Sequence, residues 1–284
     1  MAGTIKHSWL DVGDARVFVR EAGAPDAPVL LLPHGYPGSS FVYRELMVKL
    51  ADRWRLIAPD APGFGYSATP TGFDYTFAGY ARWLQQLVTA MALERYALYL
   101  HDYGSQFGLE LAMRWPERVS ALVIQNGDIY EDQHGEKYSA LEQFWSHPTP
   151  EGREALRRNV SEEGFRDEFV GEVPEKFRER ISPDLWTLHW ALMNRRDRID
   201  NVVGLFEDQA ATLERFPEQQ RYLREHRPPT LIVWGVADGY MPEGAARAYL
   251  RDLPDARLHL FDGGHWLLET HLNEVSSLIR EFLS

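Results

Sequence analysis

The chain contains 284 residues, of which 44% are apolar and 25% are charged, and this composition is typical of one large folded domain or of a domain that carries an insertion. Asp and Glu outnumber Lys and Arg by 42 to 30, so the net charge is −12 and we expect neither nucleic acid nor a membrane surface as a partner. The absence of cysteine excludes disulfides, thiolate zinc sites and cysteine nucleophiles.

The first elements that the sequence predicts are two short alternating runs, 7–11 and 15–21, which are typical of a β-hairpin. The pattern then changes to continuous apolar runs, as in strands that are buried on both faces of a parallel sheet. These runs lie at 29–32, 55–58, 96–100, 121–124, 231–234 and 258–261. Helical periodicity separates most of them, at 41–50, 77–91, 107–115, 245–253 and 275–283. The alternation predicts an α/β protein with a mostly parallel, doubly wound, eight-stranded sheet.

The alternation stops between about Ile129 and Arg227, where charged residues, Trp and helical periodicity are frequent but no strand pattern occurs. We interpret 129–226 as an inserted helical cap. The core domain would then consist of 1–128 and 227–284.

The segment 99–108 is the most informative stretch for function, because a buried strand enters a helix there directly. At such a junction the residue on the tight turn projects its side chain above the sheet edge, and its crowded backbone requires small residues just beyond it. Ser105 has Phe107 two positions later, whereas Asp102 has Gly104, so Asp102 fits the turn better. Taken alone, Asp102 could equally be the N-cap of the following helix.

Two later residues complete the chain order of nucleophile, acid and histidine that the hydrolase fold requires. Asp238 stands in a loop just past a buried strand, and His265 follows Gly263 and Gly264, which suit a loop that bends sharply. Each residue alone could be an ordinary turn or helix-start residue. Together, all just beyond the carboxyl ends of strands, they predict a catalytic site. Asp128 is a second candidate for the acid.

These motifs resemble those of the α/β-hydrolase superfamily, specifically its aspartate-nucleophile branch of epoxide hydrolases and haloalkane dehalogenases. The resemblance covers nearly the whole chain and implies the α/β-hydrolase fold with an inserted cap. Its motifs are His34-Gly35-Tyr36-Pro37, Asp60 to Ser67 as D-x-x-G-x-G-x-S, the Asp102 turn, Pro116-Glu117-Arg118-Val119, Trp234-Gly235 to Asp238, and Gly264-His265.

The chemistry of a carboxylate nucleophile restricts the reaction. Attack of Asp102 on an ester carbonyl would form an anhydride, whereas attack on a saturated carbon forms a stable alkyl ester, so we expect displacement of an epoxide oxygen or a halide. His265 would then activate the water that hydrolyses this ester, and Asp238 would orient and stabilise the imidazolium. The backbone N–H groups of Tyr36 and Tyr103 are the expected oxyanion donors.

The leaving group decides between the two activities. An alkoxide from an epoxide needs a proton, which cap tyrosines commonly supply in this family, and Tyr130 and Tyr138 are the candidates. A halide needs N–H donors, which the indoles of Trp145, Trp186 and Trp190 could supply. All five residues could instead belong to the core of the cap, because aromatic side chains fill cores more often than they line sites.

Two residues favour the epoxide. Tyr103 and Tyr36 stand where haloalkane dehalogenases usually have Trp and Asn. We place His34, beside the first oxyanion motif, with the substrate-binding residues, although no step of this scheme requires it. The leading expectation is therefore an epoxide hydrolase that forms a diol. A haloalkane dehalogenase is the alternative, followed by an esterase or lactonase or a non-catalytic small-molecule sensor.

No metal ion or organic cofactor is expected, because no cluster of His and carboxylate residues has the spacing of ligands. We expect a small apolar organic substrate. The chain starts without an apolar signal core, which predicts a cytoplasmic protein, either a monomer or a homodimer.

Overall fold

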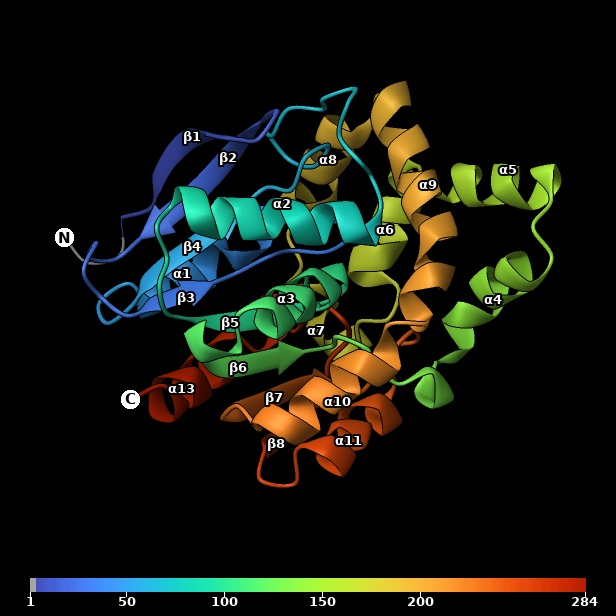
Figure 1. The fold of residues 1–284 in the computed structure, drawn as a ribbon. Helices are drawn as coiled ribbons and strands as arrows, with labels where there is room; N and C mark the ends of the chain where they lie inside the picture. Colours follow the sequence, from blue (N-terminus) through green and yellow to red (C-terminus); the bar gives the residue numbers. More distant parts are fainter. Residues whose placement is uncertain (1–3) are drawn as a thin grey trace.

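A computed structural model describes residues 4–284, and its centre is one sheet with the strand order β1-β2-β4-β3-β5-β6-β7-β8 (Figure 1). The strands are β1 (Lys6–Val12), β2 (Ala15–Ala22), β3 (Val29–Leu31), β4 (Arg55–Pro59), β5 (Tyr96–His101), β6 (Val119–Gln125), β7 (Thr230–Gly235) and β8 (Arg257–Phe261). Strand β2 pairs antiparallel with both β1 and β4, and the other pairs are parallel. The predicted eight-stranded, mostly parallel sheet is therefore confirmed.

Helices cover both faces of this sheet, which explains why the parallel strands are apolar without a break. One face carries α2 (Phe77–Ala90), α3 (Tyr103–Arg114), α10 (Phe216–His226) and α11 (Glu243–Asp252), and the other carries α1 (Arg44–Leu50), α12 (Leu267–Thr270) and α13 (Leu272–Phe282) (Figure 1). Single helical turns precede α1, at η1 (Ser40–Tyr43), and follow α3, at η2 (Pro116–Arg118). On β5, Leu98 and Leu100 belong to the first core, whereas Ala97 and Tyr99 belong to the second. Alternate residues of one strand thus fill two separate cores.

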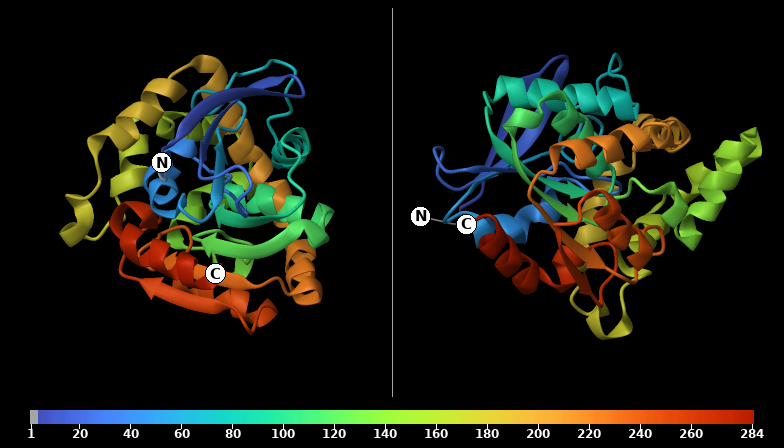
Figure 2. Two further views of the ribbon diagram at one scale, coloured as in Figure 1. Left: turned by 90° about the vertical axis from the view of Figure 1, so that its left-hand side faces the viewer. Right: turned by 60° about the horizontal axis from the view of Figure 1, so that its bottom comes forward.

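The segment between β6 and β7 contains helices and no strand of the sheet. They are η3 (Glu131–Gln133), η4 (Glu136–Tyr138), α4 (Ser139–Ser146), α5 (Pro150–Asn159), α6 (Glu162–Val170), α7 (Glu175–Arg178), α8 (Pro183–Met193) and α9 (Arg196–Leu213), followed by α10. Helices α4 to α9 gather at the end of the sheet toward which β6 points, and α4 and α5 extend furthest from it (Figures 1 and 2). Helix α10, the last helix of the predicted cap 129–226, packs against α3 and α11.

No helix within residues 4–284 combines the length and the apolar character that crossing a bilayer would require.

One buried side chain ties the cap to the core. Arg198, on α9, donates hydrogen bonds to the carbonyl oxygens of Gly65 at 2.8 Å and Ser67 at 2.6 Å, and to Oγ1 of Thr69 at 3.0 Å. These acceptors lie in the core loop that follows β4. The guanidinium group thus satisfies several polar atoms of that loop at once.

Arg198→Ala should lower the free energy of unfolding by about 2–4 kcal/mol, because it removes charge-assisted hydrogen bonds and leaves buried carbonyl oxygens without donors. Urea denaturation followed by tryptophan fluorescence measures this loss. Arg196→Ala is the matched control on the same helix, since the side chain of Arg196 is 94% exposed. Equal unfolding midpoints for the two variants would show that Arg198 does not stabilise the contact between cap and core.

Candidate active site

Asp102 occupies the turn between β5 and α3 with φ 50° and ψ −135°, a conformation that few residues other than glycine adopt. Its side chain does not cap α3. Instead, its Oδ1 accepts the backbone N–H of Tyr36 at 2.7 Å. The hydroxyl of Ser105 donates to the carbonyl oxygen of Asp102 at 2.6 Å and is therefore engaged inside the helix start. The turn presents a carboxylate and not a serine hydroxyl.

Two glycines allow this turn to be so tight. A Cβ atom on Gly104 would lie 2.3 Å from the carbonyl oxygen of Pro33, and a Cβ atom on Gly35 would lie 1.9 Å from Oδ1 of Asp102. Both distances are far below van der Waals contact. Only glycine at these two positions lets the loop after β3 approach the Asp102 turn closely.

His265 lies between two carboxylates. Its Nδ1 is 2.7 Å from Oδ2 of Asp238, and its Nε2 is 3.5 Å from Oδ2 of Asp102. Asp238 also accepts the side-chain N–H of Asn126 at 2.8 Å and the backbone N–H groups two and three residues later, at 2.9 and 3.0 Å. The structure therefore brings the predicted nucleophile, acid and histidine together, each at the carboxyl end of its strand.

The electrostatics of the site follow from this geometry. Burial lowers the pKa of His265, but the carboxylates of Asp238 and Asp102 raise it more, and the pKa lies well above the ordinary 6.5. Burial raises the pKa of Asp238, but His265 and the hydrogen bonds lower it more, so Asp238 is an anion. Burial lowers the pKa of His101 to about 3. Its ring centroid lies 4.5 Å from that of His265, with the two ring planes tilted by 38°, and the neutral ring adds no charge to the site.

Asp128, the alternative acid, lies in a different cluster. Its Oδ2 is 2.9 Å from Nε2 of His134, and its Oδ1 accepts the backbone N–H of Tyr130 at 2.8 Å. His265 is paired with Asp238 instead. The geometry favours Asp238 as the residue that orients the histidine.

Asp102 and His265 open into an inner cavity of about 130 Å³. The wall of this inner cavity combines aliphatic and aromatic side chains with a few polar groups. It consists of Tyr36, Asp102, Tyr103, Lys137, Tyr138, Ala140, Leu141, Leu156, Asn159, Glu168, Phe206, Gln209, Tyr240, Met241 and His265. Among the residues predicted to bind substrate, Tyr138 is the one that lines it.

The structure corrects the predictions for two of the other residues. The hydroxyl of Tyr130 donates to Oδ2 of Asp252 at 2.6 Å and faces α11, away from the inner cavity. His34 is buried, and its Nε2 accepts the backbone N–H of Ala61 at 3.0 Å, so its ring supports the core loop after β4 and does not bind substrate.

The structure also corrects the prediction that three Trp residues present indole N–H groups to the substrate. Trp145 donates its indole N–H to the carbonyl oxygen of Phe206 at 2.8 Å. Trp190 packs edge to face against Phe165, and Trp186 is a half-buried residue of α8. None of these three Trp residues lines the inner cavity.

The sequence analysis did not identify several polar residues that line the inner cavity. Tyr240 stands two residues after Asp238, and this position could have signalled it. Glu168 and Gln209 lie on cap helices, and no local motif marks them. Within residues 4–284, no group of three or more His, Asp or Glu side chains is arranged to hold a metal ion.

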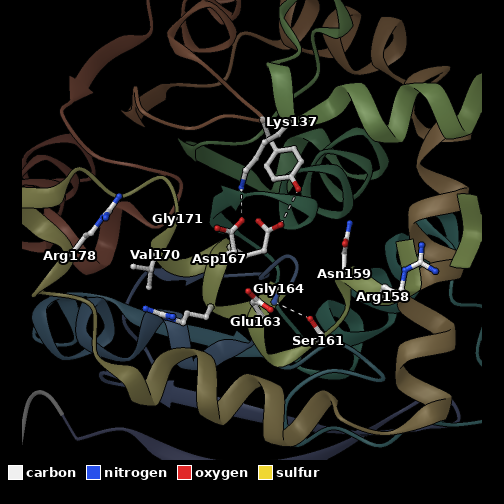
Figure 3. Close-up of a pocket in the computed structure, with 13 residues that line it drawn as sticks. Lys137, Arg158, Asn159, Ser161, Glu163, Gly164, Asp167, Val170, Gly171 and Arg178 are labelled. Carbon is white, nitrogen blue, oxygen red and sulfur yellow. Dashed lines mark hydrogen bonds and ion pairs between the residues drawn. The ribbon is translucent and has the colours of Figure 1, made fainter. Parts of the chain in front are cut away.

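A larger outer pocket of about 630 Å³ lies beside the inner cavity. The two hollows share Lys137, Asn159, Glu168 and Tyr240. In Figure 3 Lys137 points toward Asp167 near the centre of the outer pocket, while Arg158 and Arg178 stand at opposite sides. The shared residues make the outer pocket a wide, charged approach to the inner cavity.

Asp102→Asn and Asp238→Asn should each lower the pKa of His265 by about one unit or more, since each removes one of the negative charges that stabilise the imidazolium. Titration of the imidazole ¹⁵N signals by NMR measures this change. The exposed Asp255→Asn is the control and should leave the pKa unchanged. A wild-type midpoint at or below 6.5 would contradict the arrangement of His265 between two anions.

Comparison with known proteins identifies the family. The family model described as alpha/beta hydrolase fold matches residues 28–272. An uncharacterised hydrolase of Saccharomyces cerevisiae is 32% identical over 268 residues, which cover 93% of this chain and 92% of that protein. Haloalkane dehalogenase 2 of Mycobacterium tuberculosis is 29% identical over 282 residues, which cover 96% of this chain and 93% of the dehalogenase. The crystal structure of haloalkane dehalogenase DbeA from Bradyrhizobium elkani superposes with a TM-score of 0.82 at 22% identity, over 99% of both chains. The chain is therefore a member of the α/β-hydrolase family with the α/β-hydrolase fold expected from its motifs.

Proposed function

We propose that the protein opens a small epoxide to a diol through an alkyl ester on Asp102. The observation that carries this proposal is the content of the inner cavity, where phenol groups and not indoles accompany the carboxylate. An epoxide oxygen needs a proton when its C–O bond breaks, and a hydroxyl can supply one. The volume of about 130 Å³ lies below the roughly 300 Å³ of a typical ligand pocket, which favours a substrate of few atoms.

In the first step Asp102 attacks the epoxide carbon. Its Oδ1 is held by the N–H of Tyr36, so Oδ2 is the oxygen that forms the ester bond. Tyr138 can hydrogen-bond the departing oxygen, because its own oxygen accepts from Nε2 of Gln209 at 3.3 Å and its proton stays available. Tyr103 fixes the orientation of this amide by donating to its Oε1 at 2.8 Å.

In the second step water hydrolyses the ester. Esterification removes the charge of Asp102, one of the two anions that raise the pKa of His265, so His265 becomes a neutral base more readily in the intermediate than in the free enzyme. It takes a proton from water, and the hydroxide attacks the carboxyl carbon of Asp102. The N–H of Tyr36 then stabilises the charge that develops on Oδ1, a contribution typically worth about 3 kcal/mol in the barrier.

Haloalkane dehalogenation is the second candidate, favoured by the relative of that name from Mycobacterium tuberculosis. A halide would need N–H donors at the inner cavity, but the indole of Trp145 is bound to a backbone carbonyl, and neither Trp186 nor Trp190 lines the wall. A serine esterase or lactonase is less well supported, because the hydroxyl of Ser105 donates to the backbone beneath the turn.

His265→Ala, incubated with 1,2-epoxybutane, should accumulate a protein species heavier by one epoxide molecule, because the ester forms but is not hydrolysed. Intact-protein mass spectrometry detects it, and peptide mapping should place it on Asp102. Asp102→Asn should give no adduct. His226→Ala, at an exposed histidine of α10, is the control and should hydrolyse the epoxide without retaining it.

The same variant distinguishes the two candidates. An adduct with 1-bromobutane alone, together with bromide release by the wild type, would favour the dehalogenase over the epoxide hydrolase. No adduct with either compound, or an adduct that maps away from Asp102, would contradict the covalent mechanism itself.

A further inference from the structure

A second acid reaches the inner cavity from the cap. Glu168, on α6, lines both the inner cavity and the outer pocket, and its Oε1 accepts the hydroxyl of Tyr240 at 3.0 Å. Tyr240 is fixed from the core side, because its backbone N–H donates to Oδ1 of Asp238 at 2.9 Å. The pair therefore joins a cap helix to the loop that carries the partner of His265. Both side chains lie in the wall that also holds Asp102.

We propose that Tyr240 and Glu168 form a proton relay for the leaving oxygen, in which Tyr240 donates a proton to the opened epoxide and Glu168 replaces it. In this relay Tyr240 touches the reacting oxygen, and Glu168 acts through Tyr240. The inference rests on the epoxide hydrolysis proposed above and names the proton source of that same site.

A phenol alone is a poor source of this proton. Burial raises the pKa of Tyr138 and that of Tyr240, so either residue would become a costly phenolate if it gave up its proton without replacement. Tyr138 accepts its hydrogen bond from the amide of Gln209, which cannot resupply a proton. Tyr240 is bonded to a carboxyl group, which can, because a protonated Glu168 donates to the phenol oxygen and leaves the phenol proton free for the substrate.

The surroundings of Glu168 allow it to carry a proton near neutrality. Burial raises the pKa of its carboxyl group to about 7, although Lys137, the Tyr240 hydroxyl and His265 lower it. The titratable or charged groups that interact with it come from the segments around α6 and are Lys137, Glu172, Tyr36, Tyr103, Tyr240 and His265. A carboxyl group with this pKa can release its proton in one step and recover it in the next.

The protons balance over the cycle. When the ester bond to Asp102 forms and the epoxide C–O bond breaks, the alkoxide takes the proton of Tyr240, and Tyr240 takes that of Glu168. Hydrolysis of the ester returns Asp102 as a carboxylate, releases the diol and leaves one proton on His265. His265 is a cation in the free enzyme, so before hydrolysis it gives its proton to the Glu168 carboxylate, which lies close enough for the two charges to interact, and the proton that it then takes from water restores the imidazolium. Epoxide and water are the only reactants.

The relay can be tested on the first step alone, in the His265→Ala background, by following adduct formation with 1,2-epoxybutane by intact-protein mass spectrometry. The rate should fall as the pH rises past the pKa of Glu168, because Glu168 then loses its proton; this pKa is about 7 in the wild type and higher without the charge of His265. Adding Glu168→Gln should slow the adduct by about 100-fold below that pKa and abolish the pH-dependent fall, since the amide keeps the shape but cannot transfer a proton. Glu168→Asp should restore much of the rate and the fall.

Two tyrosine variants complete the test. Tyr240→Phe should give the same slow, pH-independent rate as Glu168→Gln, whereas Tyr138→Phe should slow the reaction but keep the fall with rising pH. If Glu168→Gln fails to fold, as judged by its thermal unfolding, Glu168→Asp and Tyr240→Phe decide the question.

Three outcomes would overturn the relay. An adduct that forms in Glu168→Gln with the rate and pH profile of the parent would exclude it and leave epoxide hydrolysis standing. A slower rate that keeps the fall would mean that Glu168 only shapes the inner cavity. No adduct in the parent itself would remove epoxide hydrolysis and the relay with it.

Discussion

The strained backbone of Asp102 is the constraint on which the rest of the site depends. A non-glycine residue in such a conformation typically costs about 1–3 kcal/mol, which neighbouring contacts must offset. Here the hydrogen bond from Tyr36 and the close approach allowed by Gly35 and Gly104 hold the turn. The strain turns the carboxylate away from the helix N-terminus and toward the cavity. The same atoms thus prevent Asp102 from capping the helix and leave it free to react.

The protonation state of His265 depends on the carboxylate of Asp102. His265 is stabilised as a cation by two anions, but only Asp238 is enclosed by permanent donors. In the proposed mechanism the contribution of Asp102 disappears when its side chain carries an alkyl group. One pair of atoms 3.5 Å apart would then couple the state of Asp102 to the basicity of the histidine. The neutral ring of His101 supports the loop of His265 without disturbing this coupling.

The sheet and the convergence of the three polar residues were predictable, because they follow from local patterns and one topological rule. Continuous apolar runs mark parallel strands, and residues just past the ends of such strands meet at one edge of the sheet. The cap offers no such rule. Tyr130 and Tyr138 look alike in the sequence, yet one phenol is bonded to Asp252 and the other faces the inner cavity. Their difference comes from how η3 and η4 pack on the core, which helical periodicity does not specify.

The sequences of the cap helices nevertheless contain a pattern that points to residues of the inner cavity. Val202, Phe206 and Gln209 share one face of α9, at spacings of four and three residues, and Gln209 is only 6% exposed. A buried amide is costly unless it is hydrogen-bonded, and ordinary packing would favour an aliphatic residue at this position. Both ends of the Gln209 amide are hydrogen-bonded to phenols of the inner cavity. The polar residue that interrupts the buried stripe of α9 here faces the active site, and Glu168 beside Phe165 and Phe169 does the same on α6.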